Sequence, residues 1–392
     1  IDKVWEALDD PNKYVVVQTA PAIRAALGEC FDLEPGTLVK GRMTTALKML
    51  GFDGVFDTNF TADLTILEEG TELLTKLKKA LVDKDKNVAL PMFTSCSPGW
   101  INYMESFYPE LIPNVSTCKS PQQMFGAVAK TYYADKIGKK KEDMVVISIM
   151  PCTAKKFECA REEMNASGVK DVDYVLTTRE LGKMIKQAGI DFINLPDEEM
   201  DAPLGISTGA ADIFANTGGV MEAALRTAYE IVTGRELPFD KLHIAPIQGL
   251  DGIKEASLII EGAKEEWKFL EGVTANVAVV HGLGNAKKII EVIKSGKKQY
   301  HFIEIMTCPG GCIGGGGQPR MTTDEIRKAR IQAIYKEDEG RELRKSHDNP
   351  AVKFLYEEFL GKPLGEKSHH LLHTRYFNKK DENAKLSVTI KN

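Results

Sequence analysis

Residues 301–319 read HFIEIMTCPGGCIGGGGQP, an apolar run followed by a glycine-rich loop with two cysteines. The run at 301–306 has the composition of a strand that is buried on both faces, as in parallel sheets. Four more runs of this kind alternate with helical patterns along the chain: 14–18, 88–93, 144–150 and 277–281. Alternating strands and helices predict an α/β fold with largely parallel sheets.

Four helices are predicted from the signals at their ends: 120–136, 177–189, 219–232 and 284–296. Ser120 and Pro121 supply an N-cap and a first-turn proline for the first of them. Thr177 and Glu180 form a capping box, and Gly189 stops that helix. Two connections and a charged, frayed tail are expected elsewhere: 190–206, 238–252 and 379–392.

The composition of the 392 residues restricts the classes of function. The 51 basic and 56 acidic side chains give a net charge of −5, whereas a nucleic-acid binder needs a basic surface to neutralise phosphates. No apolar run approaches the ~20 residues that span a bilayer. We therefore expect neither nucleic acid nor a membrane among the partners of this chain.

Seven cysteines are the feature that the composition does not explain. An odd number of thiols in a large chain without a visible secretory signal does not indicate a disulfide framework. Cys30, Cys118 and Cys159 are expected to pack as small hydrophobic side chains. The other four cysteines fall in three loops that follow predicted strands, and for those we expect metal or redox chemistry.

These three loops are residues 94–100 (TSCSPGW), 150–156 (MPCTAKK) and 306–319. Sites in open α/β sheets form beyond the carboxyl ends of strands, so the loops can converge on one point. Thiolates are the ligands of iron–sulfur clusters, and the glycines around Cys308 and Cys312 let the backbone approach a bulky inorganic group.

Other readings of these loops are weaker. Zinc sites more often use Cys-x-x-Cys pairs, which the chain lacks. The glycine-rich loop has no Gly-Lys-Ser/Thr ending and therefore is not a phosphate loop. Residues 281–286 match only a fragment of a dinucleotide-binding fingerprint, for which a tight strand-to-helix turn is the simpler interpretation.

Acid–base candidates precede the first cysteine loop. Glu69 and Glu72 are three residues apart and share one face of a helix, for which a solvated surface is the simpler interpretation. Lys155 can turn inward toward an anionic group. Three histidines on a predicted C-terminal helix show no ligand pattern and are expected to be structural or exposed: His369, His370 and His373.

Together, the loops resemble the signatures of the [FeFe]-hydrogenase (iron-only hydrogenase) catalytic domain. That family has Thr-Ser-Cys-Cys-Pro-x-Trp, Met-Pro-Cys-x-x-Lys, and Met-x-Cys-x-x-Gly-Cys with trailing glycines and Gln-Pro. The resemblance runs from about residue 15 to about residue 376 and includes TGGVMEAA at 217–224. It implies one catalytic domain over residues 1–392, with two α/β lobes, mostly parallel sheets flanked by helices, and the metal cofactor between the lobes.

The cofactor that the resemblance implies is the H-cluster, a [4Fe–4S] cubane joined through one cysteine to a two-iron subsite with CO, cyanide and a bridging dithiolate. The implied reaction is the reversible conversion of two protons and two electrons into H2. By position, Cys152, Cys308 and Cys312 bind the cubane, and Cys312 bridges to the two-iron unit. Lys155 contacts a cyanide. Six more residues are implied to surround the subsite: Pro21, Ala22, Gln122, Met150, Phe214 and Met306.

The resemblance also implies a path for protons. Cys96 stands at the family's proton-relay cysteine, and three further groups stand at its relay positions: Glu69, Ser116 and Glu72. A path of this kind is physically required, because protons cross a dry interior in hops between titratable or hydroxylic groups. Lys76 replaces the family's arginine at the outer end.

Ser97 is the largest departure from the family pattern, because the family has there the cysteine that supplies the fourth cubane ligand. Ser97 can bind iron through oxygen, a harder donor that lowers the cluster potential. Alternatively, the loop shifts and Cys96 binds, or the cubane binds weakly or is lost. We favour a bound cluster, with Cys96 or Ser97 as its ligand. Thr307 replaces an alanine common in the family and adds a hydroxyl that can tune the cubane.

The expected partners follow from what the chain contains. Cys30 is the one cysteine before Cys96, so we expect no N-terminal ferredoxin-like cluster domain. Electrons then come from ferredoxin or from accessory iron–sulfur domains or subunits, and dedicated maturation proteins supply the two-iron subsite. Unpaired thiols and a low-potential metal site fit a reducing, anaerobic cytoplasm.

Two other functions fit the same resemblance. One is an H2-sensing or low-turnover regulatory protein, which the serine at position 97 keeps open. The other is an iron–sulfur assembly relative without the two-iron subsite, against which Met150, Lys155 and Met306 argue. The relay residues favour turnover, since a sensor has less need of a proton path. A hydrogenase is therefore the main prediction.

Overall fold

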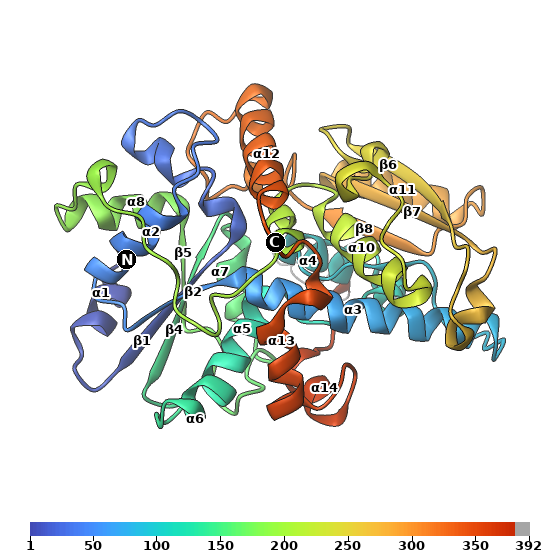
Figure 1. The fold of residues 1–392 in the computed structure, drawn as a ribbon, viewed down its shortest axis with the longest axis horizontal. Helices are drawn as coiled ribbons and strands as arrows, with labels where there is room; N and C mark the ends of the chain where they lie inside the picture. Colours follow the sequence, from blue (N-terminus) through green and yellow to red (C-terminus); the bar gives the residue numbers. More distant parts are fainter. Residues whose placement is uncertain (381–392) are drawn as a thin grey trace, which may run out of the picture.

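The computed structural model describes residues 1–380 and builds two four-stranded sheets, one in each half of the molecule (Figure 1). The first sheet contains, from edge to edge, the parallel strands β2 (Gly54–Asp57), β1 (Tyr14–Thr19), β4 (Met144–Met150) and β5 (Tyr174–Thr177). The second contains, in order, β3 (Met92–Phe93), β8 (Phe302–Met306), β7 (Thr274–His281) and β6 (Ile253–Ile259). Here β6 runs antiparallel to β7, and the other pairs are parallel. The predicted two-lobed α/β fold is confirmed.

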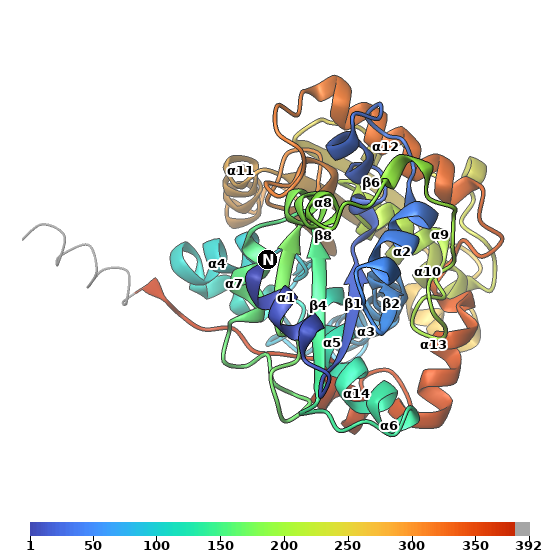
Figure 2. The same ribbon diagram turned by 90° about the vertical axis from the view of Figure 1, so that its left-hand side faces the viewer.

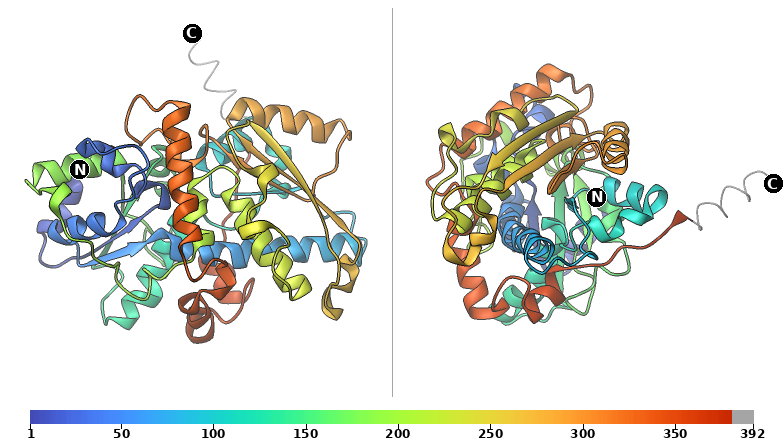
Figure 3. Two further views of the ribbon diagram at one scale, coloured as in Figure 1. Left: turned by 45° about the horizontal axis from the view of Figure 1, so that its top comes forward. Right: turned by 90° about the vertical axis from the view of Figure 1, so that its right-hand side faces the viewer.

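Helices flank both sheets (Figures 1 and 2). In chain order, the α-helices within residues 1–380 are α1 (Asp2–Asp9), α2 (Lys40–Met49), α3 (Thr58–Leu81), α4 (Pro98–Phe107), α5 (Pro121–Val128), α6 (Ala134–Lys136), α7 (Ala154–Cys159), α8 (Thr178–Gln187), α9 (Gly209–Asp212), α10 (Gly219–Thr233), α11 (Leu283–Lys294), α12 (Asp324–Glu339), α13 (Pro350–Leu355) and α14 (Glu366–Leu372). The long helix α3 packs against α5 in the first half and against α10 in the second. Figure 3 shows α12 standing between the two halves.

Both faces of the first sheet are buried, which explains why its central strands are continuous apolar runs. Val15, Val16 and Val17 of β1 are all buried, as are Ile147 and Ile149 of β4. Full burial of one such side chain contributes roughly 1.5–3 kcal/mol. A strand covered by helices on both sides has no polar face, so its sequence does not alternate.

The sequence-based strands are confirmed with one change. The runs at 14–18, 144–150, 277–281 and 301–306 each fall on an observed strand. The run at 88–93 shortens to Met92–Phe93, because residues 88–90 are only half-buried and Pro91 has no amide hydrogen for a strand ladder.

The four predicted helices are also confirmed. The helix predicted to begin at Ser120 continues to Lys136, with a π-helical turn at Ala129–Tyr133. The expected cap is wrong, because the Ser120 hydroxyl donates to Glu158 instead of accepting from the first turn. Both hydrogen bonds of the capping box between Thr177 and Glu180 are present. The connections at 190–206 and 238–252 contain only short 3₁₀ turns.

A buried ion cluster joins the two halves beside the site. The Arg24 guanidinium, just after β1, donates to Asp57 at the end of β2 at 2.8 Å. It also donates to Asp212 of α9 at 2.9 Å and to Glu337 of α12 at 3.1 Å. All three charges of the Arg24, Asp57 and Asp212 set are fully buried, and breaking such a set costs about 3–5 kcal/mol. The cluster therefore fixes the halves relative to each other.

No helix within residues 1–380 combines the length and the apolar character that crossing a bilayer would require. Of the predicted frayed tail, residues 381–392 lie outside the described residues. Lys379 is described and donates to Glu105 at 2.6 Å. The tail stays a prediction.

Candidate functional site: two adjoining cavities between the lobes

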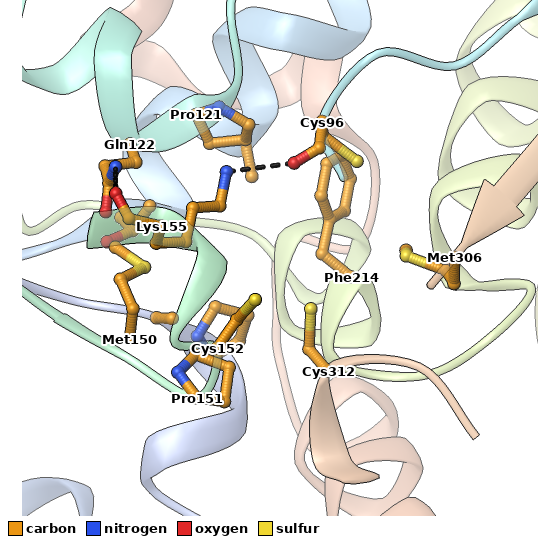
Figure 4. A pocket seen from close by; sticks show the side chains of 14 residues that line it. Cys96, Pro121, Gln122, Met150, Pro151, Cys152, Lys155, Phe214, Met306 and Cys312 are labelled. Atoms are coloured by element: carbon orange, nitrogen blue, oxygen red, sulfur yellow. Dashed lines mark hydrogen bonds between the residues drawn. The ribbon is translucent and has the colours of Figure 1, made fainter. Parts of the chain in front are cut away.

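The three cysteine loops meet between the two sheets. Cys96 and Ser97 follow β3, Cys152 follows β4, and Cys308 and Cys312 follow β8. The loops thus leave the carboxyl ends of strands in both sheets, which is where α/β folds build their sites. Figure 4 shows the side chains of Cys96, Cys152 and Cys312 turned toward one common space.

Close backbone contact holds the second and third loops together. The Gly317 amide donates to the Pro151 carbonyl oxygen at 2.7 Å. A Cβ atom at Gly315 would lie 2.3 Å from the same oxygen, which is closer than any side chain can approach. Glycine is therefore required there for the Cys312 loop to reach the Cys152 loop.

The first of two cavities at this junction, the apolar cavity, has a volume of about 60 Å³. Six of the residues implied by the resemblance line it: Pro21, Gln122, Met150, Lys155, Phe214 and Met306. Ala22 does not line the cavity. It is fully buried, and its carbonyl oxygen accepts a hydrogen bond from Gln318 at 3.1 Å.

The second, the thiol cavity, has a volume of about 40 Å³ and adjoins the first. Its lining includes the three cysteines expected to bind a cubane, the serine at the fourth position and the neighbouring threonine: Cys152, Cys308, Cys312, Ser97 and Thr307. Both cavities share one wall, formed by Cys96, Cys152, Lys155, Met306 and Cys312. The predicted ligand positions are thus gathered around one space.

The thiols differ in their tendency to ionise. A hydrogen bond from the Cys308 thiol lowers the pKa of Cys152 to about 6, with help from the charge of Lys155. The same bond raises the pKa of Cys308. Burial raises the pKa of Cys312 to about 12 and also raises the pKa of Cys96. Cys152 is therefore the one of these four thiols whose pKa is lowered rather than raised.

The Lys155 ammonium is fixed at the common wall. It donates to the main-chain oxygen of Cys96 at 2.9 Å (Figure 4). It also donates to Glu158 at 2.9 Å. Glu158 also accepts hydrogen bonds from Ser120 at 2.8 Å and from Gln122 at 3.0 Å. The sequence analysis did not identify Glu158, although its place three residues after Lys155 in a helix was a usable signal.

A row of acidic groups leads from the cavities toward solvent. Glu69 of α3 is buried, and neither of its carboxylate oxygens has a hydrogen-bond partner. Burial, together with the charge of Glu72, raises the pKa of Glu69 to about 8. The Ser116 hydroxyl donates to Glu72 at 2.8 Å, and the half-buried Lys76 ammonium lies 3.3 Å from the other Glu72 oxygen. Glu69 and Glu72 thus face the interior, and the interpretation as a solvated surface is wrong.

His373 extends this row as a structural histidine, whereas His369 and His370 are exposed, in agreement with the prediction for the three. His373 is buried, with Nδ1 2.8 Å from the Thr117 hydroxyl and Nε2 3.1 Å from Glu68. One ligating atom each of Glu72, Cys118 and His373 lies within 4.8 Å of the others. His369 stacks on His373 with ring centroids 4.6 Å apart. Only the fold brings these residues together, because about 300 positions separate Glu68 from His373 in the chain.

The residues present fit the cofactor that the resemblance implies. Four thiols and two hydroxyls line the thiol cavity, and thiolates are the ligands that iron–sulfur clusters require. The buried Gln122 Oε1, on a residue that lines the apolar cavity, has no partner within the described residues. A polar atom left unpaired in this way indicates a ligand that completes it.

Residues 13–316 match the family described as "Iron only hydrogenase large subunit, C-terminal domain". The chain belongs to this family. Residues 324–379 match a second family, "Iron hydrogenase small subunit". The iron-only hydrogenase match covers the first two cysteine loops, the third loop as far as Gly316, and the acidic row up to Ser116, so the resemblance drawn from the motifs is confirmed.

Two curated relatives illustrate the match. The chain is 55% identical over 378 residues to the NADP-reducing hydrogenase subunit HndD of Solidesulfovibrio fructosivorans, covering 96% of this chain and 62% of that protein. It is 44% identical over 391 residues to iron hydrogenase 1 of Clostridium pasteurianum, covering 96% and 63%. The chain therefore spans about three-fifths of the length of these relatives.

The fold agrees with a solved structure of the family. A cysteine-to-histidine variant of the apo [FeFe]-hydrogenase HydA1 from Chlamydomonas reinhardtii superposes with a TM-score of 0.84 at 46% identity, over 96% of this chain and 98% of that one. Weaker matches, at 30–32% identity, include proteins named as cytosolic iron–sulfur assembly factors.

Proposed function

We propose that this chain is the catalytic part of a hydrogenase, which interconverts H2 with two protons and two electrons at an H-cluster. The observation that carries the proposal is the shared wall between a cavity lined by thiols and a cavity lined mainly by apolar side chains. When bound, the cofactor would supply the redox chemistry and the iron at which H2 is made or split. The chain's own residues would bind it, exclude water and move protons.

Three thiols would bind the cubane. Cys152 is already inclined to be a thiolate, the form that binds metal, because of its lowered pKa. Cys308 lines only the thiol cavity, which supports a role confined to the cubane. Cys312 lies on the common wall, and this position supports its role as the ligand that joins the cubane to the two-iron subsite.

Side chains of the apolar cavity would enclose the two-iron subsite. Met150, Phe214 and Met306 are nearly fully buried and would exclude water. Lys155 presents a positive charge at the wall, where Glu158 holds it, and such a charge would attract an anionic ligand such as cyanide. Pro21 and Gln122 would complete the enclosure, and Ala22 would support it from its buried position in the same segment.

Protons would move along the acidic row. The raised pKa of Cys96 keeps its thiol protonated at neutral pH, so the sulfur can give and regain a proton without a stable charge. The raised pKa of Glu69 keeps a proton on its carboxyl group near neutrality, ready for transfer. The Ser116 hydroxyl connects onward to Glu72, and Lys76 would set the outer end of the path.

Partners and compartment are part of the same proposal. Electrons would be exchanged with ferredoxin or with accessory iron–sulfur domains or subunits, and maturation proteins would install the two-iron subsite. A match to an iron hydrogenase small subunit family supports a partner of the iron–sulfur kind. A reducing cytoplasm would keep the cysteines free, although one relative is named as a periplasmic hydrogenase.

The row of acidic groups favours a hydrogenase over the alternatives. A sensor of low turnover has less need of a connected proton path, and an assembly factor has no need of an enclosed apolar cavity beside its thiols. The carboxyl group of Glu69 has no hydrogen-bond partner and a pKa of about 8. These properties suit a group that transfers protons, and an assembly factor that only holds a cluster does not need them. We therefore propose a hydrogenase that turns over H2.

The test is H2 evolution from a reduced viologen after two loading steps. The full chain is first reconstituted with iron and sulfide, and then incubated with a synthetic two-iron compound carrying CO, cyanide and the dithiolate. We expect H2 production in the loaded protein and none in a Cys308→Ala variant treated identically. A fully loaded protein without turnover would favour the sensor, and a protein that takes up no cluster would contradict the cofactor assignment.

A further inference from the structure

Ser97 occupies the N-cap position of α4, yet its side chain does not cap the helix. A serine in this position ordinarily accepts a hydrogen bond from an amide of the first turn, which stabilises a helix by about 1 kcal/mol. Here only its carbonyl serves the helix, by accepting the Ile101 amide at 3.1 Å. The hydroxyl therefore has another use.

That hydroxyl contacts Thr307 on the third loop. Ser97 Oγ lies 2.7 Å from Thr307 Oγ1 and accepts a hydrogen bond from the Thr307 amide at 3.2 Å. Ser97 is only 9% exposed, and both residues line the thiol cavity but not the apolar cavity. The pair thus joins the loop after β3 to the loop after β8 at the cavity itself.

Packing fixes Thr307 in this position. A Cβ atom at Gly99 would lie 2.7 Å from Thr307 Oγ1 and 2.8 Å from its methyl carbon. A larger residue at position 99 would therefore push the threonine away from Ser97. The two departures from the family pattern, Ser97 and Thr307, accordingly form one structural unit with Gly99.

We propose that Ser97 Oγ is the fourth protein ligand of the cubane and that Thr307 positions it. This inference rests on the proposed function, because it requires a cluster in the thiol cavity. A serine oxygen that binds iron carries negative charge and is stabilised by hydrogen-bond donors. Thr307 supplies two donors, its amide and its hydroxyl, and the N-terminus of α4 adds partial positive charge.

Ligation is balanced without a further reagent. One iron–oxygen bond forms while the cluster assembles, and the hydroxyl proton passes to water. No oxidation state changes. The Thr307 hydroxyl then donates to the bound oxygen, which is the orientation that the 2.7 Å separation allows.

The same geometry leaves Cys96 to the proton path. Cys96 lies on the wall common to both cavities, and its main-chain oxygen is fixed by Lys155 at 2.9 Å. Moving its sulfur into the place of Ser97 would require this contact and the Ser97–Thr307 pair to break. Oxygen ligation requires neither change.

The experiment uses the full chain reconstituted with iron and sulfide only, with no two-iron compound. Iron content, the EPR spectrum and the reduction potential of the cluster are measured. The variants are Ser97→Ala, Ser97→Cys, Thr307→Ala, Thr307→Ser and Cys96→Ala. Ser95→Ala is the matched control, because this hydroxyl lies on the same loop but donates to the Cys118 carbonyl at 2.7 Å.

We expect Ser97→Ala to lose about one iron in four and to show the EPR signal of a three-iron cluster. Ser97→Cys should retain the iron and raise the potential, since sulfur is the softer donor. Thr307→Ala should lower the potential, because the bound oxygen loses a hydrogen-bond donor, and Thr307→Ser should restore it. Cys96→Ala and Ser95→Ala should match the wild type in all three measurements.

Iron loss in Cys96→Ala together with a complete cluster in Ser97→Ala would assign the ligand to Cys96 and overturn the proposal. Complete clusters in both variants would overturn it as well, since the fourth ligand would then not come from either residue. If the wild type binds no cluster at all, the proposed function itself fails. Ser97→Cys separates a change of ligand from misfolding, because the shift of its reduction potential is measured in a protein that still holds a full cluster.

Discussion

The apolar cavity and the thiol cavity share a wall but differ in what they require of their residues. The apolar cavity needs shape, dryness and one fixed charge, which Met150, Phe214 and Lys155 provide. The thiol cavity needs particular donor atoms, and it is there that the chain departs from its family, at Ser97 and Thr307. Enclosure can be built from many side chains, whereas a ligand position accepts only a few donor atoms. A substitution at such a position therefore has to be matched by a neighbour.

The largest effect is expected from removing a donor in the thiol cavity. Cys308→Ala leaves two thiols and one hydroxyl for the cubane, and we expect cluster binding and H2 production to be lost together. Iron analysis after reconstitution checks this. Cys159→Ala is the control, because Cys159 is buried in the core away from both cavities. Equal iron in Cys308→Ala and wild type would show that the cluster is bound elsewhere.

The next effect separates proton transfer from cluster binding. Glu69→Gln keeps the shape of the side chain but removes its titration, so H2 evolution should fall by about 100-fold or more. Iron content should stay at the wild-type level, because Glu69 lines neither cavity. Thr75→Ala on the same helix is the control, since its hydroxyl bonds only within α3. Unchanged turnover in Glu69→Gln would place the proton path elsewhere.

A smaller effect is expected in the apolar cavity. Met150 is 3% exposed, and its truncation to alanine should lower the free energy of unfolding by about 2–5 kcal/mol. We expect Met150→Ala to retain the four-iron cluster and to load less of the two-iron compound, because the enclosure is opened to water. Met150→Leu preserves most of the volume and should behave nearly as the wild type. A loss of the cubane in Met150→Ala would contradict the division between the cavities.

The mildest prediction concerns the pH dependence of stability in the apo protein. Burial raises the pKa of Glu69 from 4.5 to about 8, so the folded chain retains a proton that the unfolded chain releases. Its contribution to stability is fully present below 4.5 and is lost as the pH rises through about 8. Urea unfolding over this range should show a weaker fall in stability for Glu69→Gln than for the wild type. Parallel curves would mean that Glu69 ionises normally.

Much of the fold could be predicted because the buried strands are continuous apolar runs. β4 was predicted to the residue, and the capping box set the start of α8. The helices α3 and α12 were not predicted, since α3 carries polar residues that become buried only between the lobes. The edge strand β6 has one buried residue and otherwise alternates between half-buried and exposed positions, so it lacks a continuous apolar run.

The site was predictable in its thiols and not in its supporting contacts. The cysteines fall in loops that directly follow predicted strands, and this local pattern was enough to predict that they converge. Glu68 and His373 were given no role because they pair with each other across 305 positions. Glu158 was missed although its partner Lys155 lies only three residues before it. The pairing of Ser97 with Thr307, 210 positions apart, likewise required the three-dimensional structure.

The most direct test of the division between the two cavities is the Cys96→Ala variant, because Cys96 lies on their common wall. Its iron content and H2 evolution are measured after both loading steps. We predict a complete cubane and a rate at least about 100-fold below that of the wild type, since only the proton relay is removed. Wild-type turnover, or loss of the cubane, would contradict the account.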